Sequence, residues 1–261
     1  MGRIISVISG KGGVGKSTVA LNLSAALAGK YGARVALVDL NLSTPHIAAM
    51  AGIGPSSKTL EDVLCGKAAL SSALHVHESG ADILPSSISP RKLTPGDLGQ
   101  IGPVLRRLKS SYDYVILDSS PGLGKESMLA MRYGDDLLYV STPTVPSLMD
   151  VMRCKKAVSN LGKSHLGLIL NMVAGGEAQL SAAQASSMCD LAVLESIPHD
   201  KSVARSLAFE RSVVYYDLHS PAAGSFLSLG AKISGKRNVA PRGGSMRRLL
   251  HSLSGGFFHT K

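Results

Sequence analysis

The sequence predicts an α/β fold: a doubly wound, mostly parallel sheet with helices on both faces. Apolar runs recur along the 261 residues with helical stretches between them, and this alternation is typical of a parallel sheet buried on both sides. A glycine-rich loop separates the first apolar run from the first helical stretch. Hydrophobic residues make up 44% of the chain, which is enough for one large domain or two small ones.

The apolar runs define the predicted strands. The run from Ile4 to Ile8 predicts the first one, because it is bounded by polar residues and leads directly into the glycine-rich loop. In chain order, strands are expected at Arg3–Ser9, Arg34–Asp39, Asp82–Pro85, Tyr114–Asp118, Asp136–Ser141, Leu166–Asn171 and Ala192–Glu195.

Helices are expected between these runs. The stretch after the glycine-rich loop predicts an amphipathic helix, with apolar residues at Val19, Leu21, Leu23, Ala26 and Leu27. In chain order, helices are expected at Lys16–Lys30, Thr94–Lys109, Lys125–Arg132, Pro146–Leu161, Leu180–Cys189, Ser202–Glu210 and Ser220–Ile233. Shorter connecting structure is expected at Ile47–Cys65 and Leu70–Gly80.

The glycine-rich loop spans residues 10–18 and has the strand–loop–helix setting that a phosphate-binding loop requires. Its members are Gly10, Lys11, Gly12, Gly13, Val14, Gly15, Lys16, Ser17 and Thr18. The glycines let successive backbone N–H groups turn toward one anion at the positive end of a helix. We expect Lys16 to reach the terminal phosphates and the Ser17 hydroxyl to hold Mg²⁺. The chain is therefore predicted to bind a nucleoside triphosphate, the alternative being a glycine-rich turn that binds nothing.

A second lysine, Lys11, precedes the usual one. The run from Lys11 to Thr18 resembles the deviant Walker A motif of the MinD/ParA family of P-loop ATPases, most closely its MinD-type members. The resemblance implies that the chain binds ATP and forms a homodimer around two nucleotides. In that dimer Lys11 would cross the interface and contact the partner's nucleotide. Without the family, Lys11 is a solvated loop cation.

The segment after the second predicted strand is similar to switch I of MinD-type ATPases, where two acidic residues stand two apart. Asp39 matches the first and is expected near Mg²⁺ or its waters. Asn41 replaces the second, which in the family positions or deprotonates the attacking water. A carboxamide orients water but does not take its proton, and general-base help is worth about 10²–10⁴-fold in rate. We expect slow hydrolysis, because phosphoryl transfer depends mostly on positioning and charge neutralisation; the alternative is that Asn41 is a plain turn residue.

The strand at Tyr114–Asp118 is followed by Ser119, Ser120, Pro121 and Gly122. Asp118 resembles the switch II aspartate that is bonded to Mg²⁺ through water, and the Gly122 backbone N–H is the expected contact to the γ-phosphate. The alternative is that Asp118 only caps a helix.

Two later strand ends match the family less closely. Asn171 resembles the residue that bonds the adenine edge, or is a plain turn residue, and Pro198 lies in a segment that resembles the loop packing against the base.

The net charge of +10 is unevenly placed. From Leu218 to the end the chain has no acidic residue and seven cations, which indicates an anionic partner, either membrane or nucleic acid. We expect residues 1–233 to form the ATPase domain and residues 234–244 a flexible basic linker.

The three cysteines are widely spaced and form no Cys-x-x-Cys pair. An iron–sulfur carrier on this fold is therefore not favoured, and a reducing, cytoplasmic setting is expected.

Residues 245–258 predict an amphipathic helix that binds membrane. The residues expected to bind membrane fall into three groups. The apolar stripe has helical spacing and consists of Met246, Leu249, Leu250 and Leu253. Arg247 and Arg248 lie on the other faces of the helix, and Phe257 and Phe258 follow it. The segment is similar to the membrane-targeting sequence of MinD-type proteins. Each cation near an anionic leaflet contributes about 1 kcal/mol to membrane binding. One tail is therefore expected to bind the membrane weakly, and the two tails of a dimer to bind it well. The alternatives are a helix that packs on protein and a DNA-binding tail, which would more often be a longer basic run.

The resemblance implies a switch ATPase that dimerises with ATP, attaches to the inner face of the cell membrane and positions a cellular component. An unknown regulatory protein would be a further partner. Two alternatives remain open at this point. One is a nucleotide-gated scaffold with little or no hydrolysis, because of Asn41, and the other is a ParA-like partition ATPase on DNA, although a nucleic-acid partner is not expected.

Overall fold

The computed structural model describes residues 2–55, 57–88, 93–176 and 178–237. Over these residues it forms one sheet with strand order β3-β4-β2-β5-β1-β6-β7-β8. The strands are β1 (Arg3–Ile8), β2 (Val35–Asp39), β3 (His75–Val76), β4 (Asp82–Leu84), β5 (Tyr114–Asp118), β6 (Asp136–Ser141), β7 (Ser164–Val173) and β8 (Val193–Pro198). The predicted membrane helix at 245–258, and the linker beyond residue 237, lie outside the described residues.

Helices connect the strands. They are α1 (Lys16–Gly29), α2 (Ile47–Met50), α3 (Leu60–Leu64), α4 (Leu70–Ala73), α5 (Pro95–Gly99), α6 (Ile101–Ser111), α7 (Lys125–Tyr133), α8 (Val145–Ala157), α9 (Ala182–Cys189), α10 (Lys201–Ala208), α11 (Val213–Tyr216) and α12 (Pro221–Ser234). None of them, within the part of the chain that the structure describes, combines the length and apolar character needed to cross a bilayer.

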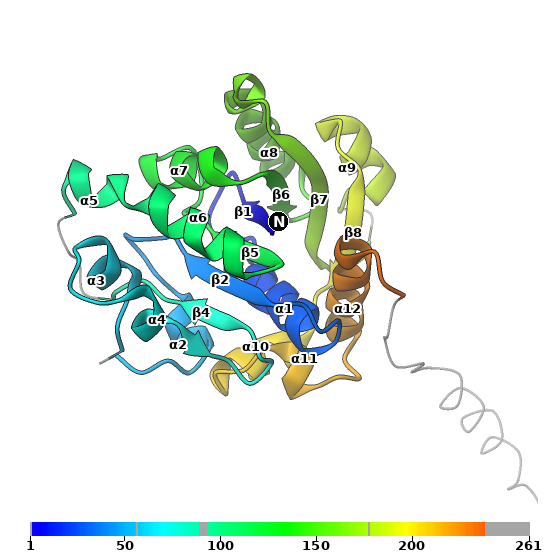
Figure 1. The fold of residues 1–261 in the computed structure, drawn as a ribbon. Coiled ribbons are helices and arrows are strands. Elements are labelled where there is room, and N and C mark those ends of the chain that lie inside the picture. Colours follow the sequence, from blue (N-terminus) through cyan, green and yellow to red (C-terminus); the bar gives the residue numbers. More distant parts are fainter. Residues whose placement is uncertain (1, 56, 89–92, 177, 238–261) are drawn as a thin grey trace, which may run out of the picture.

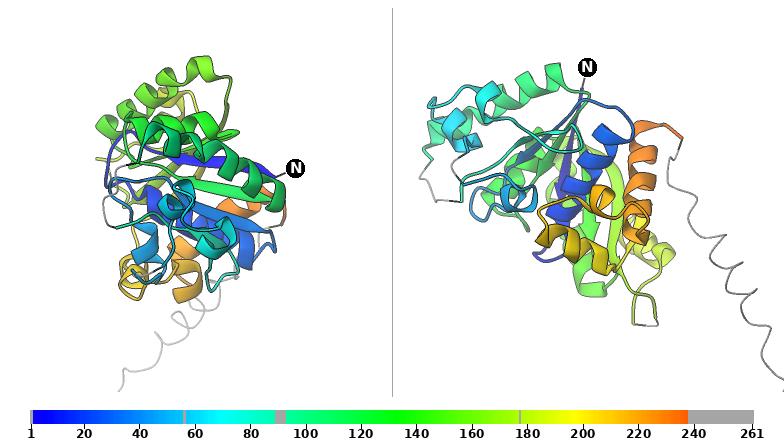
Figure 2. Two further views of the ribbon diagram at one scale, coloured as in Figure 1. Left: turned by 60° about the vertical axis from the view of Figure 1, so that its left-hand side comes forward. Right: turned by 90° about the horizontal axis from the view of Figure 1, so that it is seen from below.

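The sheet is parallel except at one edge, where β3 pairs antiparallel with β4. Strands β2, β5, β1 and β6 lie next to one another, so the helices that join them cover both faces (Figures 1 and 2). This confirms the predicted doubly wound, mostly parallel sheet. In the β2–β5 pair, Asp39 stands opposite Asp118, so the carboxyl ends of two strands that are far apart in sequence bring two carboxylates together.

Side chains of alternating direction build a core on each face of the sheet. On one face Ile5 and Val7 pack with α1 and α12, and on the other Ile4 packs with α6. Helix α1 differs from the amphipathic helix that was predicted, because every residue from Val19 to Ala28 is buried. The reason is that α12 covers the face of α1 that points away from the sheet.

Several predicted boundaries are corrected by the structure. The single helix predicted at Thr94–Lys109 is two helices, α5 and α6, that meet at Gln100. Pro103 lacks the N–H that would bond to the Gly99 carbonyl across this joint. Strands β7 and β8 run on to Val173 and Pro198, so Asn171 lies within a strand and Pro198 ends one instead of starting a loop.

Candidate functional site

The loop between β1 and α1 has the backbone of an anion-binding turn. Gly13 and Gly15 have φ angles of 79° and 85°, in the left-handed region that glycine adopts without steric cost. Gly15 is the residue before the first turn of α1, where no side chain caps the helix and no acidic residue lies. A helix that starts in this way favours an anion at its N-terminus.

A cleft of about 570 Å³ opens over this loop, within the range of roughly 300–1,000 Å³ that small-molecule sites occupy. One wall is the phosphate loop, whose residues from Lys11 to Thr18 all line the cleft. The other walls come from the segments after β2 and β5 and from helices α2 and α10; they are Asn41, Thr44, His46, Met50, Pro121 and Leu207. The fold therefore brings together the phosphate loop and Asn41 of switch I.

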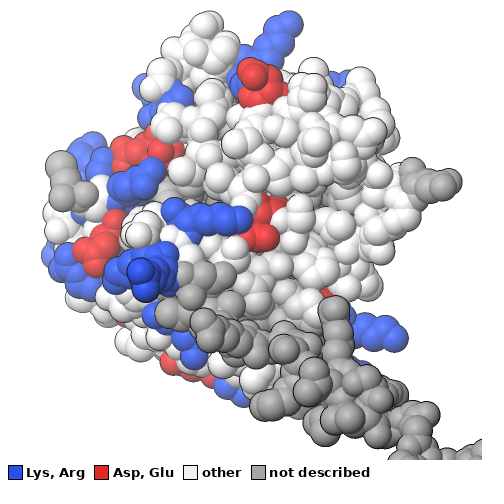
Figure 3. All heavy atoms as spheres, turned by 90° about the vertical axis from the view of Figure 1, so that its right-hand side faces the viewer, with Lys and Arg blue, Asp and Glu red and all other residues white. Residues whose placement is uncertain are grey.

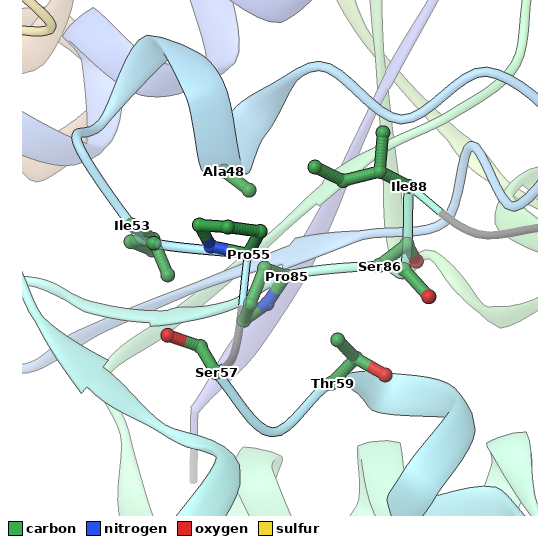
Figure 4. Close-up of a pocket in the computed structure, with 10 residues that line it drawn as sticks. Ala48, Ile53, Pro55, Ser57, Thr59, Pro85, Ser86 and Ile88 are labelled. Atoms are coloured by element: carbon green, nitrogen blue, oxygen red, sulfur yellow. The ribbon is translucent and has the colours of Figure 1, made fainter.

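A second hollow lies beside α2 and is much smaller, about 60 Å³. Figure 4 shows the proline rings of Pro55 and Pro85 and the side chain of Ile88 around it, with the hydroxyls of Ser57 and Thr59 at its rim. This volume is too small for a nucleotide. The cleft over the phosphate loop is the candidate site.

Three charged side chains are buried at the floor of the site. Lys16 is 6% exposed, and Asp39 and Asp118 are fully buried. The Lys16 ammonium Nζ lies 2.5 Å from Asp118 Oδ1. Two carboxylates thus share one cation, and burial together with the charge of Asp118 raises the pKa of Asp39 to about 8.

A divalent cation would let both carboxyl groups of this site ionise. Asp118 Oδ2 is buried and has no hydrogen-bond partner among the described residues, as expected of an oxygen that serves a metal or its water. Both oxygens of Asp39 already accept backbone N–H groups, from Asn41 at 2.9 Å and Ile47 at 3.2 Å. Carboxylate and hydroxyl oxygens are the ligands that Mg²⁺ prefers, so Asp118, Ser17 and, through water, Asp39 are the residues that would hold it.

Asn41 is 3% exposed, and both ends of its amide are bonded. Its Nδ2 donates to the Thr44 carbonyl at 2.5 Å, and its Oδ1 accepts from the Thr44 hydroxyl at 3.1 Å and from the Ser120 hydroxyl at 2.8 Å. Asn41 therefore links the segments after β2 and β5 through Ser120, whereas its two bonds to Thr44 are those of a turn residue.

Gly122 has a φ of 77° and follows β5 at the cleft. Its N–H, the predicted donor to the γ-phosphate, donates here to the Ser9 carbonyl at 2.9 Å. The N–H must leave Ser9 before it can bond to a phosphate, so its predicted role requires movement of the segment after β5.

The two residues predicted to recognise the base lie outside the cleft wall. Asn171 is 6% exposed and its Nδ2 donates to the Val14 carbonyl at 2.8 Å. A Cβ on Gly15 would stand 2.1 Å from the same nitrogen. In this structure Asn171 thus supports the phosphate loop from behind, and contact with adenine stays a prediction, as does the packing of Pro198 against the base.

Sequence reasoning missed several cleft-wall residues, namely Thr44, His46, Met50, Pro121 and Leu207. It also missed Glu126 in the first turn of α7, which lines a neighbouring hollow with Asn41. Its carboxylate accepts from the Ser43 hydroxyl at 2.5 Å and is also hydrogen-bonded to Ser120. The only signal available was an acidic residue at the start of a predicted helix, which ordinarily indicates no more than a favourable helix dipole.

Comparison with known proteins agrees with this geometry. A family model described as an AAA domain matches residues 2–168. An uncharacterised ATP-binding protein of Methanocaldococcus jannaschii is 30% identical over 90% of this chain and 89% of its own length. The septum site-determining protein MinD of Thermotoga maritima is 31% identical over 78% of each chain.

The chain belongs to the MinD/ParA family of P-loop ATPases.

Solved structures of the family superpose on this fold. MinD of Pyrococcus horikoshii, complexed with Mg-ADP, matches with a TM-score of 0.82 and 31% identity, over 89% of this chain and 96% of that one. The cell division ATPase MinD of Pyrococcus furiosus matches with a TM-score of 0.82 and 30% identity, over 90% and 99%. ATP and Mg²⁺ are the nucleotide and the metal of this family.

Proposed function

We propose that this chain is a MinD-like switch ATPase: it dimerises with ATP, attaches to the membrane through its C-terminal tail and positions a cellular component. Slow hydrolysis of ATP to ADP and phosphate, stimulated by a regulatory protein partner, would reset it. The protein would work in the cytoplasm at the inner face of the cell membrane. The single observation that carries the proposal is the contrast between the two lysines of the phosphate loop.

Lys11 and Lys16 lie on the same loop but in opposite surroundings. Lys16 is buried and paired with Asp118, whereas Lys11 is exposed at the wall of the cleft. Lys16 can therefore serve the nucleotide of its own chain. Lys11 points to solvent beside the cleft, where a second copy of the chain can present its nucleotide.

The surface near Lys11 also suits a second copy. Gly10 is packed against the backbone of Asp150 in α8, and a Cβ on Gly122 would lie 3.7 Å from the Gly10 carbonyl. The neighbouring side chains of Leu123 and Met149 are 46% and 45% exposed. A dimer formed at this surface would cover these apolar side chains and the nucleotide together.

Binding of a triphosphate would exchange the partner of Lys16. The ammonium is held by Asp118 in this structure, and phosphate oxygens at the loop compete for the same charge. Mg²⁺, when bound, neutralises the charge that develops on the phosphates. Asp118, once released by Lys16, keeps a buried charge that the metal compensates, so nucleotide and metal would bind together.

The membrane step rests on the sequence of the tail. Residues 245–258 combine an apolar stripe, two arginines and two phenylalanines, which suits an anionic bilayer surface. The tail follows α12, whose last residue is Ser234. On the face shown in Figure 3, Lys and Arg gather toward one side and are mixed with acidic residues, a distribution that does not favour a ParA-like use of this face on DNA.

One specific observation supports the second candidate, a scaffold with little or no hydrolysis. Position 41 holds an amide whose oxygen and nitrogen are both bonded within the chain. Phosphate release separates the candidates: tight ATP binding with turnover at background would favour the scaffold.

The test of the proposal uses the full chain with ADP, ATP or a non-hydrolysable analogue. Light scattering after size exclusion reports the dimer, and co-sedimentation with anionic vesicles reports membrane attachment. We expect dimers and vesicle binding with ATP or the analogue only. A chain that remains monomeric when saturated with the analogue would refute the switch.

A further inference from the structure

The Glu126 carboxylate joins the two segments that surround Asn41. Its Oε1 accepts from the Ser43 hydroxyl at 2.5 Å, on the segment after β2. Its Oε2 is hydrogen-bonded to the Ser120 hydroxyl, on the segment after β5. Glu126 itself belongs to the first turn of α7, where the helix N-terminus stabilises a negative charge.

The Ser120 hydroxyl faces two acceptors. It lies 2.8 Å from Asn41 Oδ1 and is also hydrogen-bonded to Glu126 Oε2. A hydroxyl has one proton to donate, so Ser120 donates to only one of the two acceptors at a time. The row Asn41–Ser120–Glu126 thus has two arrangements, one with the Ser120 proton directed to Asn41 and one with it directed to Glu126.

This row starts at the nucleotide cleft and leads away from it. Glu126 lines a hollow of about 450 Å³ together with Asn41, Thr44, Ser120 and Pro121. Asn41, Thr44 and Pro121 also line the cleft over the phosphate loop. Glu126 is only partly buried, so a proton that it accepts has a route to solvent.

We propose that Glu126 is a positioning residue for hydrolysis that takes, through Ser120, the proton that Asn41 cannot take. The inference rests on the proposed ATP hydrolysis. The oxygen of the attacking water forms a bond to the γ-phosphorus, and the bond from phosphorus to the β,γ-bridging oxygen breaks, its electron pair leaving on ADP. The water's proton passes to Ser120 Oγ while the proton of Ser120 passes to Glu126. In this arrangement Asn41 Oδ1 keeps its hydrogen bond from the Thr44 hydroxyl.

The experiment is a double-mutant cycle between positions 126 and 41 in the full chain with Mg-ATP. Glu126→Gln keeps the size and hydrogen-bonding capacity of the side chain but removes its basicity. We expect kcat to fall about 10²-fold, the lower end of general acid–base contributions, with KM for ATP and analogue-induced dimerisation unchanged. Asn41→Asp supplies a carboxylate at the cleft that can take the proton directly, so adding Glu126→Gln there should lower kcat by no more than about twofold, and this difference between the two backgrounds is the coupling that the cycle measures. Glu195→Gln, the same change on the edge strand β8, should leave kcat unchanged.

The outcomes separate this inference from the proposed function. Equal losses from Glu126→Gln in both backgrounds indicate a structural role and overturn it, as does wild-type kcat in Glu126→Gln. A chain that dimerises with the analogue but does not hydrolyse ATP also overturns it and leaves the dimeric switch in place. Failure to dimerise refutes the proposed function itself, whatever the cycle shows.

Discussion

The ammonium of Lys16 and the carboxylate of Asp118 form a buried ion pair 2.5 Å apart, between residues that are 102 positions apart in the chain. Asp39 stands beside Asp118 in register on the neighbouring strand. Removing one member of a buried pair leaves an uncompensated charge, which is usually more costly than the pair itself is worth. This relationship gives Lys16 a role in stability beside its predicted role as a ligand for phosphate.

Replacing Lys16 by Ala should therefore remove nucleotide binding and also destabilise the protein, by about 3 kcal/mol or more. Urea unfolding and nucleotide titration measure the two effects. Lys16→Ala combined with Asp118→Asn should recover most of the stability but no nucleotide binding. Lys11→Ala, at an exposed position of the same loop, should not change stability. A stable Lys16→Ala protein would contradict the structural role of the pair.

Asp39 should make the nucleotide-free protein less stable as the pH rises. Burial first, and the charge of Asp118 second, raise the pKa of Asp39 to about 8, whereas an unfolded aspartate ionises near pH 3.9. The contribution of Asp39 to the free energy of unfolding is therefore complete below the pKa of the unfolded state. It is lost as the pH rises through the pKa of the folded state.

Thermal unfolding without Mg²⁺ at pH 5 and pH 8 checks this. Asp39→Asn should reduce the difference between the two midpoints by about 2–4 °C per kcal/mol removed. Asp190→Asn is the matched control, because Asp190 is exposed and Lys155 lowers its pKa, so that it stays ionised over this range. If the midpoint of thermal unfolding changes with pH equally in Asp39→Asn and in the unchanged chain, the raised pKa of Asp39 is ruled out.

Lys11→Ala should lose dimerisation with a non-hydrolysable analogue and keep nucleotide binding by the monomer. The reason is that Lys11 is exposed at the cleft, whereas Lys16 and the buried carboxylates remain in place. Light scattering and fluorescent-nucleotide titration measure the two properties separately. A dimer of normal affinity in Lys11→Ala would show that this lysine does not serve the partner's nucleotide.

Replacing Asn171 tests whether its amide binds the base of the nucleotide or only supports the phosphate loop. Because Asn171 Nδ2 donates to the Val14 carbonyl, Asn171→Ala should weaken ATP and GTP binding alike if the residue only supports the loop. If it bonds the adenine edge, ATP binding should weaken and GTP binding should not. Competition titrations with both nucleotides decide between the two.

The tail should carry membrane binding through its apolar stripe. Replacing Leu249 and Leu250 by Glu removes two apolar residues, each worth roughly 1.5–3 kcal/mol when buried, and should release the ATP-bound protein from anionic vesicles. His251→Glu with Ser252→Glu adds the same acids off the stripe and should release it less. ATP affinity should be equal in all three proteins. Equal sedimentation of the Leu249 and Leu250 variant with vesicles would refute the anchor.

Local sequence signals were sufficient for most of the fold. Strands β5 and β6 have the predicted limits, Tyr114–Asp118 and Asp136–Ser141, because each is an apolar run bounded by polar residues and buried on both faces. Strand β3 was not predicted, since its two residues form a strand only by pairing with β4. Helix α11 was missed for a similar reason: a single turn has no periodicity to read.

The phosphate loop and the sequence of the tail were readable from the chain alone, because glycine spacing and apolar periodicity are local properties. Only the tertiary structure decided which groups meet: Lys16 with Asp118, Asn41 and Glu126 with Ser120, and Asn171 with the backbone carbonyl of Val14. These partners come from different strands and helices, and their contacts are set by the order and register of the sheet. A residue such as Glu126 has no local signature of its role, because that role exists only where the segments after β2 and β5 converge.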